Sequence, residues 1–412
     1  LKGRFRKTKV FRIHTLTLSG GLSGRYCVLI SLCTVFPVTF LYQLSSERAL
    51  PGIVKVSITF CLLAFVSGCE TLQFYHQAAR GQAALLWSRT PTNELLQSKI
   101  DPALRDRIEM AGDVLGFASQ IGLPVSGAYL SYVATGEPYV VWNVFAAKPY
   151  ESALKTSCFP VAGCVTYRGY FKRKDADSYA NRLESKGYEV YVAGVAAYST
   201  LGWFNDPLLD TFLFRSDEQL AALLFHELAH RVVYVRGDTR FNESLATTIE
   251  LYALEQWLQT RDESDRFDRY RLSLARRASV IELIMLARHR LALLYDSGIP
   301  MAEMKVQKQS IFQEMRDAYS RLRETWAVGK EFYDWMQGPM SNAKLETVAD
   351  YNEWVPLLTA RLDKLGFEQF KRELARLASL SQPERDAELK AELNAKLNAE
   401  LNGFKLAGNT SR

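Results

Sequence analysis

Two histidines and a glutamate near the middle of the chain have the spacing of a metal site. His226 and His230 stand four residues apart in the segment FHELAH. On a helix, residues at this spacing lie on one face, about 40° apart around the axis, so both imidazoles can reach one ion. Glu227 completes the pattern HExxH, in which the carboxylate does not bind the metal but takes the proton from a water molecule that attacks a carbonyl. The spacing therefore predicts a zinc site that hydrolyses peptide bonds.

A third ligand must come from another element, because the two histidines use up the available face of their helix. Asn242 is a suitable start for the next helix and would place Glu243 in its first turn, where the carboxylate can turn back toward the histidines. Glu250 lies two turns further along nearly the same face and could be the ligand itself or the partner of a ligand. The spacing leaves both glutamates as candidates.

The segment that carries the histidines is predicted to be a helix that begins at Ser216. Ser216 and Gln219 have the capping-box spacing, which fixes a helix start. Four leucines of this helix would face the core: Leu220, Leu223, Leu224 and Leu228. Ionisable side chains beside so apolar a face are costly to bury unless they bind something, and a metal is the simplest partner.

A small mixed α/β layer is predicted just before this helix. β-branched and aromatic runs predict strands at 139–145, 165–171 and 188–194, with a helix at 174–186. Further helices are predicted at 70–87, at 102–120 and through 247–330. The fold class is therefore α+β and mainly helical. An edge strand of the layer could pair with an extended substrate.

An aromatic and glycine-rich loop, residues 198–207, connects the layer to the metal helix. Loops on a scaffold often carry binding residues. Tyr198 is one candidate for a phenol that stabilises the oxyanion during attack. The alternative is a packed connector.

The first 68 residues have the composition of a targeting segment. They carry nine lysines and arginines against one glutamate, a net of +8, so the rest of the chain carries −2 of the overall +6. Residues 69–412 are therefore nearly neutral, and their net charge does not indicate a basic surface that binds nucleic acid. The apolar run from Val56 to Phe65 has the length of a signal peptide and is short for a membrane span. No methionine precedes Met110, and we expect part of this segment to lie upstream of the natural start.

The apolar run ends in Val66-Ser67-Gly68-Cys69, which resembles a bacterial lipobox. This pattern predicts a mature chain that begins at Cys69 and carries a lipid on that residue. Several acyl chains on one cysteine would hold the body to a membrane without a transmembrane helix. The alternative is an uncleaved hydrophobic anchor helix.

Two further cysteines, Cys158 and Cys164, remain in the expected mature chain and fit export. In an oxidising periplasm this pair could close a small loop as a disulfide. Zinc ligation by the pair and two buried free thiols are the alternatives.

The last residues, 381–412, differ from the rest of the chain. Leucines recur every four residues among Ala, Glu, Lys and Asn: Leu389, Leu393, Leu397 and Leu401. This pattern predicts a low-complexity, solvated helical tail. The sequence thus divides into a targeting segment at 1–68, a peptidase domain at 69–380 and this tail.

HELAH at 226–230 with NESLA at 242–246 resembles the gluzincin arrangement, in which HExxH is followed by a helix of NExxA type whose glutamate is the third ligand. More narrowly, the chain resembles the family of bacterial lipoproteins named putative or predicted aminopeptidases. This resemblance runs through residues 68–72, 158–164, 198–207, 225–246 and 341–345. It implies a zincin-like zinc peptidase of the cell envelope, with His226, His230 and Glu243 as ligands and Glu227 as base.

The Gly-x-Met-Glu-Asn element, by which gluzincin aminopeptidases hold the amino terminus of a substrate, is absent from the sequence. The residues therefore do not distinguish an exopeptidase from an endopeptidase. Two alternative functions fit the same residues: a non-catalytic, zinc-containing envelope lipoprotein, and a metal-dependent amidase that acts on cell-wall peptides. The expected partners are a peptide substrate and, through Cys69, a membrane that the protein meets from the periplasm. The sequence predicts no oligomeric state.

Overall fold

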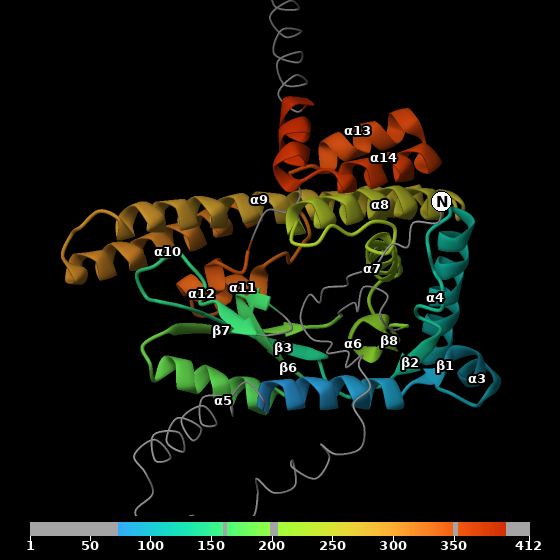
Figure 1. Cartoon of the computed structure of the whole chain (residues 1–412), viewed down its shortest axis with the longest axis horizontal. Helices are drawn as coiled ribbons and strands as arrows, with labels where there is room; N and C mark the ends of the chain where they lie inside the picture. Colours follow the sequence, from blue (N-terminus) through green and yellow to red (C-terminus); the bar gives the residue numbers. More distant parts are fainter. Residues whose placement is uncertain (1–72, 160–162, 198–204, 349–352, 393–412) are drawn as a thin grey trace, which may run out of the picture.

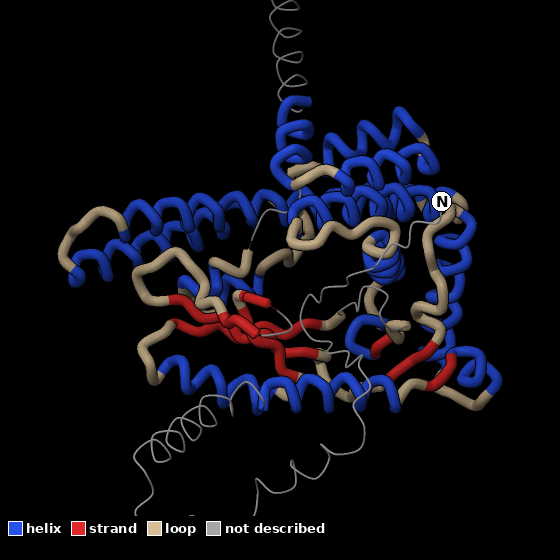
Figure 2. The backbone as a smooth tube through the Cα atoms, in the orientation of Figure 1, coloured by secondary structure: helices blue, strands red, loops and turns tan. Residues whose placement is uncertain are grey.

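The computed structural model describes residues 73–159, 163–197, 205–348 and 353–392. This part of the chain is mainly helical with three small sheets, which confirms the predicted α+β class (Figures 1 and 2). The expected targeting segment, Cys69 and Tyr198 lie outside the described residues. Within them, no helix combines the length and apolar character needed to cross a membrane.

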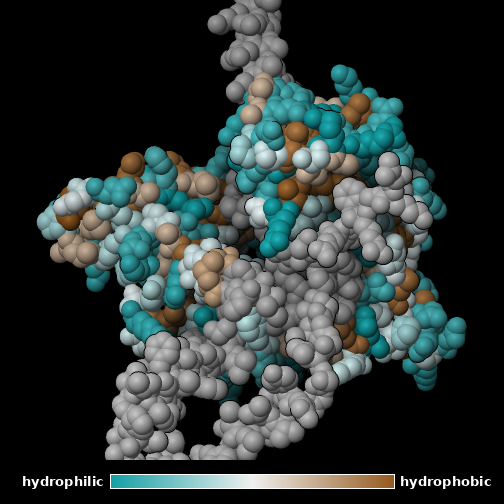
Figure 3. Space-filling view, in the orientation of Figure 1, coloured by the Kyte–Doolittle hydropathy of each residue, from teal (hydrophilic) through white to brown (hydrophobic). Residues whose placement is uncertain are grey.

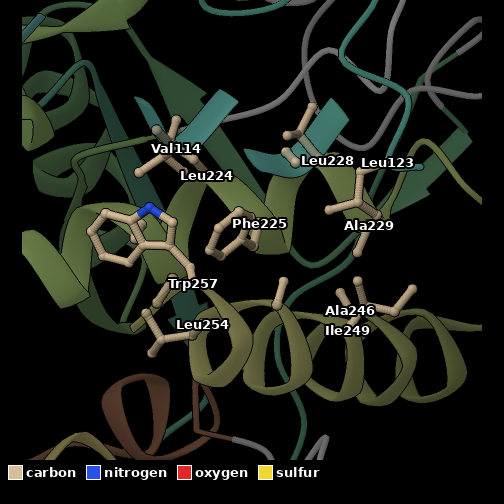
Figure 4. Packing of buried hydrophobic residues seen from close by; sticks show 14 of the residues in the cluster. Val114, Leu123, Leu224, Phe225, Leu228, Ala229, Ala246, Ile249, Leu254 and Trp257 are labelled. Atoms are coloured by element: carbon tan, nitrogen blue, oxygen red, sulfur yellow. The ribbon is translucent and has the colours of Figure 1, made fainter. Parts of the chain in front are cut away.

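Helices α7 (Asp217–Ala229) and α8 (Thr239–Gln259) pack against each other at the centre of the molecule. Figure 4 shows Phe225 of α7 directed at α8, with Leu254 and Trp257 beside it. These three side chains are at most 3% exposed. Burying side chains of this size stabilises the fold by about 1.5–3 kcal/mol each. The α7–α8 contact therefore fixes the orientation of one helix relative to the other, and with it the relative positions of the polar side chains that both helices carry.

Three further helices cover this pair. α4 (Pro102–Gln120) packs on α7, where Phe117 meets Phe225 edge-on with 6.1 Å between ring centroids. Helices α13 (Val355–Leu365) and α14 (Phe367–Ser379) lie over α8 (Figure 1). The expected helix at 102–120 agrees with α4, whose Asp101 cap accepts a hydrogen bond from the backbone of Leu104.

Helices α9 (Ser264–Tyr295) and α10 (Met301–Glu324) form a long hairpin that projects from the body (Figure 1). Ile284 and Phe312 belong to a separate core between the two helices. The outer face of the hairpin exposes apolar side chains, among them Leu286 and Leu293, and hydrophobic patches on this hairpin are visible in Figure 3.

The main sheet has the strand order β6-β3-β7, with antiparallel neighbours throughout. Its strands are β3 (Val141–Ala147), β6 (Tyr167–Tyr170) and β7 (Glu189–Val195), and α5 (Arg173–Glu184) follows β6. The three predicted strands and the predicted helix agree with these bounds to within two residues. The helix at 73–87 and α5 pack on the sheet through Phe74, Trp142 and Tyr179.

The remaining elements are short. β1 (Thr90–Pro91), β2 (Ser131–Val133) and β8 (Leu208–Leu209) form one sheet, and β4 (Ser157–Phe159) and β5 (Gly163–Val165) form a hairpin closed by a disulfide between Cys158 and Cys164. The short helices are α3 (Thr92–Gln97), α6 (Asp210–Leu213), α11 (Tyr333–Gln337) and α12 (Asn342–Leu345).

Helix α12 ties the sheet to the α9–α10 hairpin. The buried amide of Asn342 donates to the carbonyl oxygen of Pro149 at 3.0 Å, and its oxygen accepts a hydrogen bond from the Tyr295 hydroxyl at 2.7 Å. Lys308 of α10 donates to the same Pro149 oxygen at 2.6 Å. The loop after β3 is thus held from both helices of the hairpin.

Residues 382–392 form one more helix, whose residues are exposed or partly exposed with two exceptions. Arg385 and Leu389 are fully buried, because Arg385 pairs with Asp238 and Leu389 packs on the central core. Residues 393–412, the rest of the expected tail, lie outside the described part.

Candidate metal centre

Helix α7 presents both histidines at its C-terminal end. The helix begins after Ser216, as predicted, but the Ser216 side chain makes no capping bond to the helix, so the expected capping box is not formed. His226 lies in the last turn and His230 is the C-cap residue, with 4.9 Å between the ring centroids. Glu227 is partly exposed.

The turn before α8 differs from the prediction. The helix begins at Thr239 with Asp238 as its N-cap, so Asn242 is not its first residue and Glu243 lies in the second turn. Asn242 instead accepts a hydrogen bond from the Val235 N–H at 2.8 Å and donates one to the Val235 carbonyl at 2.7 Å. This side chain closes the short connection between α7 and α8.

Glu243 faces the two histidines across the α7–α8 contact. Its Oε2 lies 3.3 Å from Nε2 of His226 and 3.9 Å from Nε2 of His230. One ligand atom from each of the three side chains lies within 4.8 Å of the others, and no other described group of His, Cys, Asp and Glu has this geometry. Tetrahedral zinc, with bonds of about 2.0–2.2 Å, places neighbouring ligand atoms about 3.4 Å apart. The donor set and its spacing therefore fit a zinc ion with an open fourth position.

Glu250 contacts the opposite nitrogen of His226. Its Oε2 lies 2.9 Å from Nδ1 of the imidazole, and the Tyr270 hydroxyl donates to its Oε1 at 2.6 Å. A carboxylate at Nδ1 favours the tautomer with the proton on that nitrogen, which leaves Nε2 to bind a metal. Of the two candidate glutamates, Glu243 lies on the Nε2 side of His226, which His230 shares, and Glu250 lies on the opposite side of the ring.

Three carboxylates surround His226. Burial lowers the pKa of its imidazole, but hydrogen bonds to Glu243 and Glu250, together with the charges of Glu250 and Glu227, raise the pKa to about 10. The surroundings thus favour positive charge at this position, and the same field favours a divalent cation.

Tyr270 is a site residue that sequence reasoning missed. Burial and the neighbouring Glu250 raise the pKa of its phenol far above the usual value, so the hydroxyl stays protonated and can donate. It lies on α9, twenty residues from its partner, and no local pattern marks it.

A second missed residue, Tyr129, lies near the general-base candidate. Burial and the charges of Glu227 and Asp206 raise the pKa of its phenol well above the usual value. Its φ of 61° is in the left-handed region, which bulky residues rarely adopt. Arg231, at the end of the HExxH segment, donates to the carbonyl oxygen of Val125 at 2.6 Å and so holds this loop against α7.

Among the described residues, the other histidines and cysteines lie elsewhere. His76 lines a cavity of about 910 Å³ between the helix at 73–87 and α5, and none of the three metal-facing side chains lines it. His289 is exposed on α9. Cys158 and Cys164 are joined to each other, so neither thiol is available to a metal.

Comparison with known proteins adds an independent finding. A family model described as "Putative aminopeptidase" matches residues 73–389, which is most of the chain. Comparisons with curated proteins and with solved structures find no match. The matched region includes α7, α8 and α9, the three helices that carry the candidate site.

Proposed function

The chain belongs to the Putative aminopeptidase family, and on that premise we propose that it is a zinc-dependent peptidase with His226, His230 and Glu243 as ligands. The observation that carries this proposal is the convergence of one atom from each of these side chains within 4.8 Å. Neutral imidazole and carboxylate are ligands that zinc prefers. Two histidines and one glutamate leave a fourth position open, as catalytic zinc sites require.

Zinc in such a site polarises the carbonyl of a peptide bond and makes water nucleophilic near neutral pH. The protein contributes the proton transfers. Glu227 is partly exposed and lies next to His226 in the chain, outside the ligand trio. It accepts the proton of the attacking water and passes it to the leaving amine.

Glu250 and Tyr270 support the ligand His226 in this proposal. The carboxylate holds the imidazole through Nδ1, and the phenol holds the carboxylate through its second oxygen. A chain of hydrogen bonds of this kind fixes the ring orientation and raises the basicity of the metal-binding nitrogen.

The finer assignment as an aminopeptidase rests on the description of the family. The location at the envelope rests on the sequence around Cys69, which predicts a mature chain that begins with a lipid-modified cysteine. Mass spectrometry of the N-terminal peptide of the native protein checks this, and an unmodified Cys69, or residues before it, contradicts the lipoprotein assignment.

The experiment for the peptidase function compares hydrolysis of a mixed peptide library by the wild type and by Glu227→Gln. Loss of the base should lower kcat by about 10²–10⁴-fold, with zinc content unchanged because Glu227 is not a ligand. Glu184→Gln, at the exposed end of α5, is the matched control and should keep full activity. A zinc-loaded wild type that cleaves no peptide, or a Glu227→Gln variant as active as the wild type, contradicts the proposal.

A further inference from the structure

The C-terminal helix at 382–392 reaches the N-cap of α8, five residues before Glu243. Arg385 of this helix is fully buried and donates from Nε and Nη2 to Oδ2 of Asp238, at 3.0 and 2.6 Å. Its Nη1 donates to the carbonyl oxygens of Leu377 and Leu380 at 3.0 and 2.9 Å. The guanidinium also lies 4.9 Å from the centre of the Phe241 ring. The planar guanidinium, with five donors in fixed directions, suits this position because it can donate to the carboxylate and to both carbonyl oxygens at once. The single ammonium group of a lysine lacks this geometry.

Asp238 is the other half of this contact and the N-cap of α8. Its Oδ1 accepts a hydrogen bond from the Phe241 N–H at 3.0 Å, while Oδ2 is occupied by Arg385. The carboxylate is 2% exposed, so its charge needs a partner inside the protein. One side chain thus joins the start of α8 to the C-terminal helix.

Two further residues near the start of α8, Arg240 and Ser244, are contacted from the C-terminal region. Arg240 donates to Glu353 at 2.8 Å and to Asp386 at 2.5 Å. The backbone N–H of Trp354 donates to the Ser244 hydroxyl at 3.3 Å. Residues on both sides of Glu243 are therefore held by residues more than a hundred positions later in the chain.

We propose that Arg385 is a positioning residue for the metal centre: through Asp238 it fixes the first turn of α8 so that Glu243 faces His226 and His230. This inference rests on the proposed zinc site. The side chain itself touches neither metal nor substrate, and acts on the third ligand through the backbone of α8. A metal-binding side chain that is already held in place loses less conformational entropy when the metal binds. Loss of the support should therefore weaken metal affinity.

The test measures the zinc Kd of the full chain by competition with a chromophoric chelator, together with the Tm of the metal-free protein. Arg385→Met alone leaves the Asp238 charge buried without its partner and can prevent folding. The informative variant is therefore Asp238→Asn with Arg385→Met, because asparagine still caps the helix and no charge is left buried. We expect the zinc Kd of this double variant to rise by about tenfold or more.

Arg288→Met is the matched control. Arg288 forms a partly buried pair with Glu346, about 27 Å along α9 from Tyr270. This variant should lower Tm and leave the zinc Kd unchanged. A double variant with lowered Tm and the wild-type Kd means that Arg385 only stabilises the fold, and overturns the inference. A wild type that binds no zinc overturns the proposed metal site and this inference with it, whereas tight zinc binding by wild type and double variant alike overturns the inference alone.

Discussion

His226 is the residue on which the interactions of the site converge. Its Nε2 faces Glu243 and its Nδ1 faces Glu250, which in turn accepts a hydrogen bond from Tyr270. The two ring nitrogens have different partners, so each carboxylate has a different role. In the proposed site, Glu243 would share the ion with the imidazole, whereas Glu250 holds the orientation of the ring.

Replacing Tyr270 with phenylalanine tests the outer part of this chain of hydrogen bonds. Tyr270→Phe removes the donor to Glu250 but keeps the ring, so the fold should be retained while the zinc Kd rises by about tenfold. Tyr252→Phe, on α8 and stacked on Phe367, is the control that should bind zinc like the wild type. The measurement is a chelator-competition titration, and an unchanged Kd in Tyr270→Phe would show that Glu250 needs no support.

The raised pKa of His226 gives a pH dependence to the stability of the metal-free protein. The pKa rises from the ordinary 6.5 to about 10 on folding, so protonation stabilises the folded state. That contribution is complete below about pH 6.5 and is lost as the pH rises through 10. Urea unfolding of chelator-treated protein between pH 6 and pH 10.5 should show this loss in the wild type and a smaller one in His226→Gln. Equal losses in both proteins would contradict the assignment.

The ligands could be predicted from the sequence only in part. His226 and His230 stand at positions i and i+4 of a helix, and residues at this spacing lie on the same face of any helix. Their proximity could therefore be predicted from the sequence alone. The choice of Glu243 over Glu250 depended on resemblance to a family, because both glutamates lie on nearly the same face of α8. Tyr270 could not be predicted, because its contact depends on how α9 packs against α8.

At the scale of elements, the connection between α7 and α8 positions Glu243, the proposed third ligand. Asp238 caps the second helix and Asn242 bonds both backbone groups of Val235, so the end of the connection is held against the start of α8. Helices and strands with strong periodicity were predicted to within two residues. The start of α8 was not, because Asp238 and Asn242 are both good N-cap residues and the structure uses Asp238.

Asn242→Ala tests the closure of this connection. The buried amide makes two hydrogen bonds, and their loss leaves the N–H and C=O of Val235 without that partner. We expect the free energy of unfolding to fall by about 1–3 kcal/mol. Asn181→Ala, on the exposed face of α5, should change it by less than about 0.5 kcal/mol. Equal effects in urea denaturation would mean that the connection is held by other contacts.

At the scale of the whole molecule, hydrogen bonds and packing join parts that are distant in the chain. Asn342 donates to carbonyl oxygens after β3, more than 190 residues earlier. Leu389 and Arg385, near the end of the described chain, are buried against the centre. A sequence pattern reports the local period and not the partner, so the low-complexity composition at the C-terminus did not reveal that the helix at 382–392 buries Arg385 and Leu389.

Asn342→Ala should therefore affect stability and not the site. The substitution removes the buried amide between the sheet and the α9–α10 hairpin, so the free energy of unfolding should fall by about 1–3 kcal/mol. The zinc Kd should stay that of the wild type, since Asn342 contacts residues 148–151, Glu189 and Tyr295 and none of the ligands. A weakened Kd in this variant would show that the hairpin and the metal centre are coupled.

The zinc stoichiometry of the purified full chain tests the central claim most directly. Measured by elemental analysis after dialysis, the wild type should hold one zinc ion per chain, and His226→Ala and Glu243→Ala should each lose it. Glu250→Gln should retain zinc with lower affinity, because that carboxylate lies behind His226 and not on the metal-facing side. A wild type without stoichiometric metal, or a Glu243→Ala variant that keeps its zinc while Glu250→Gln loses it, would contradict the account.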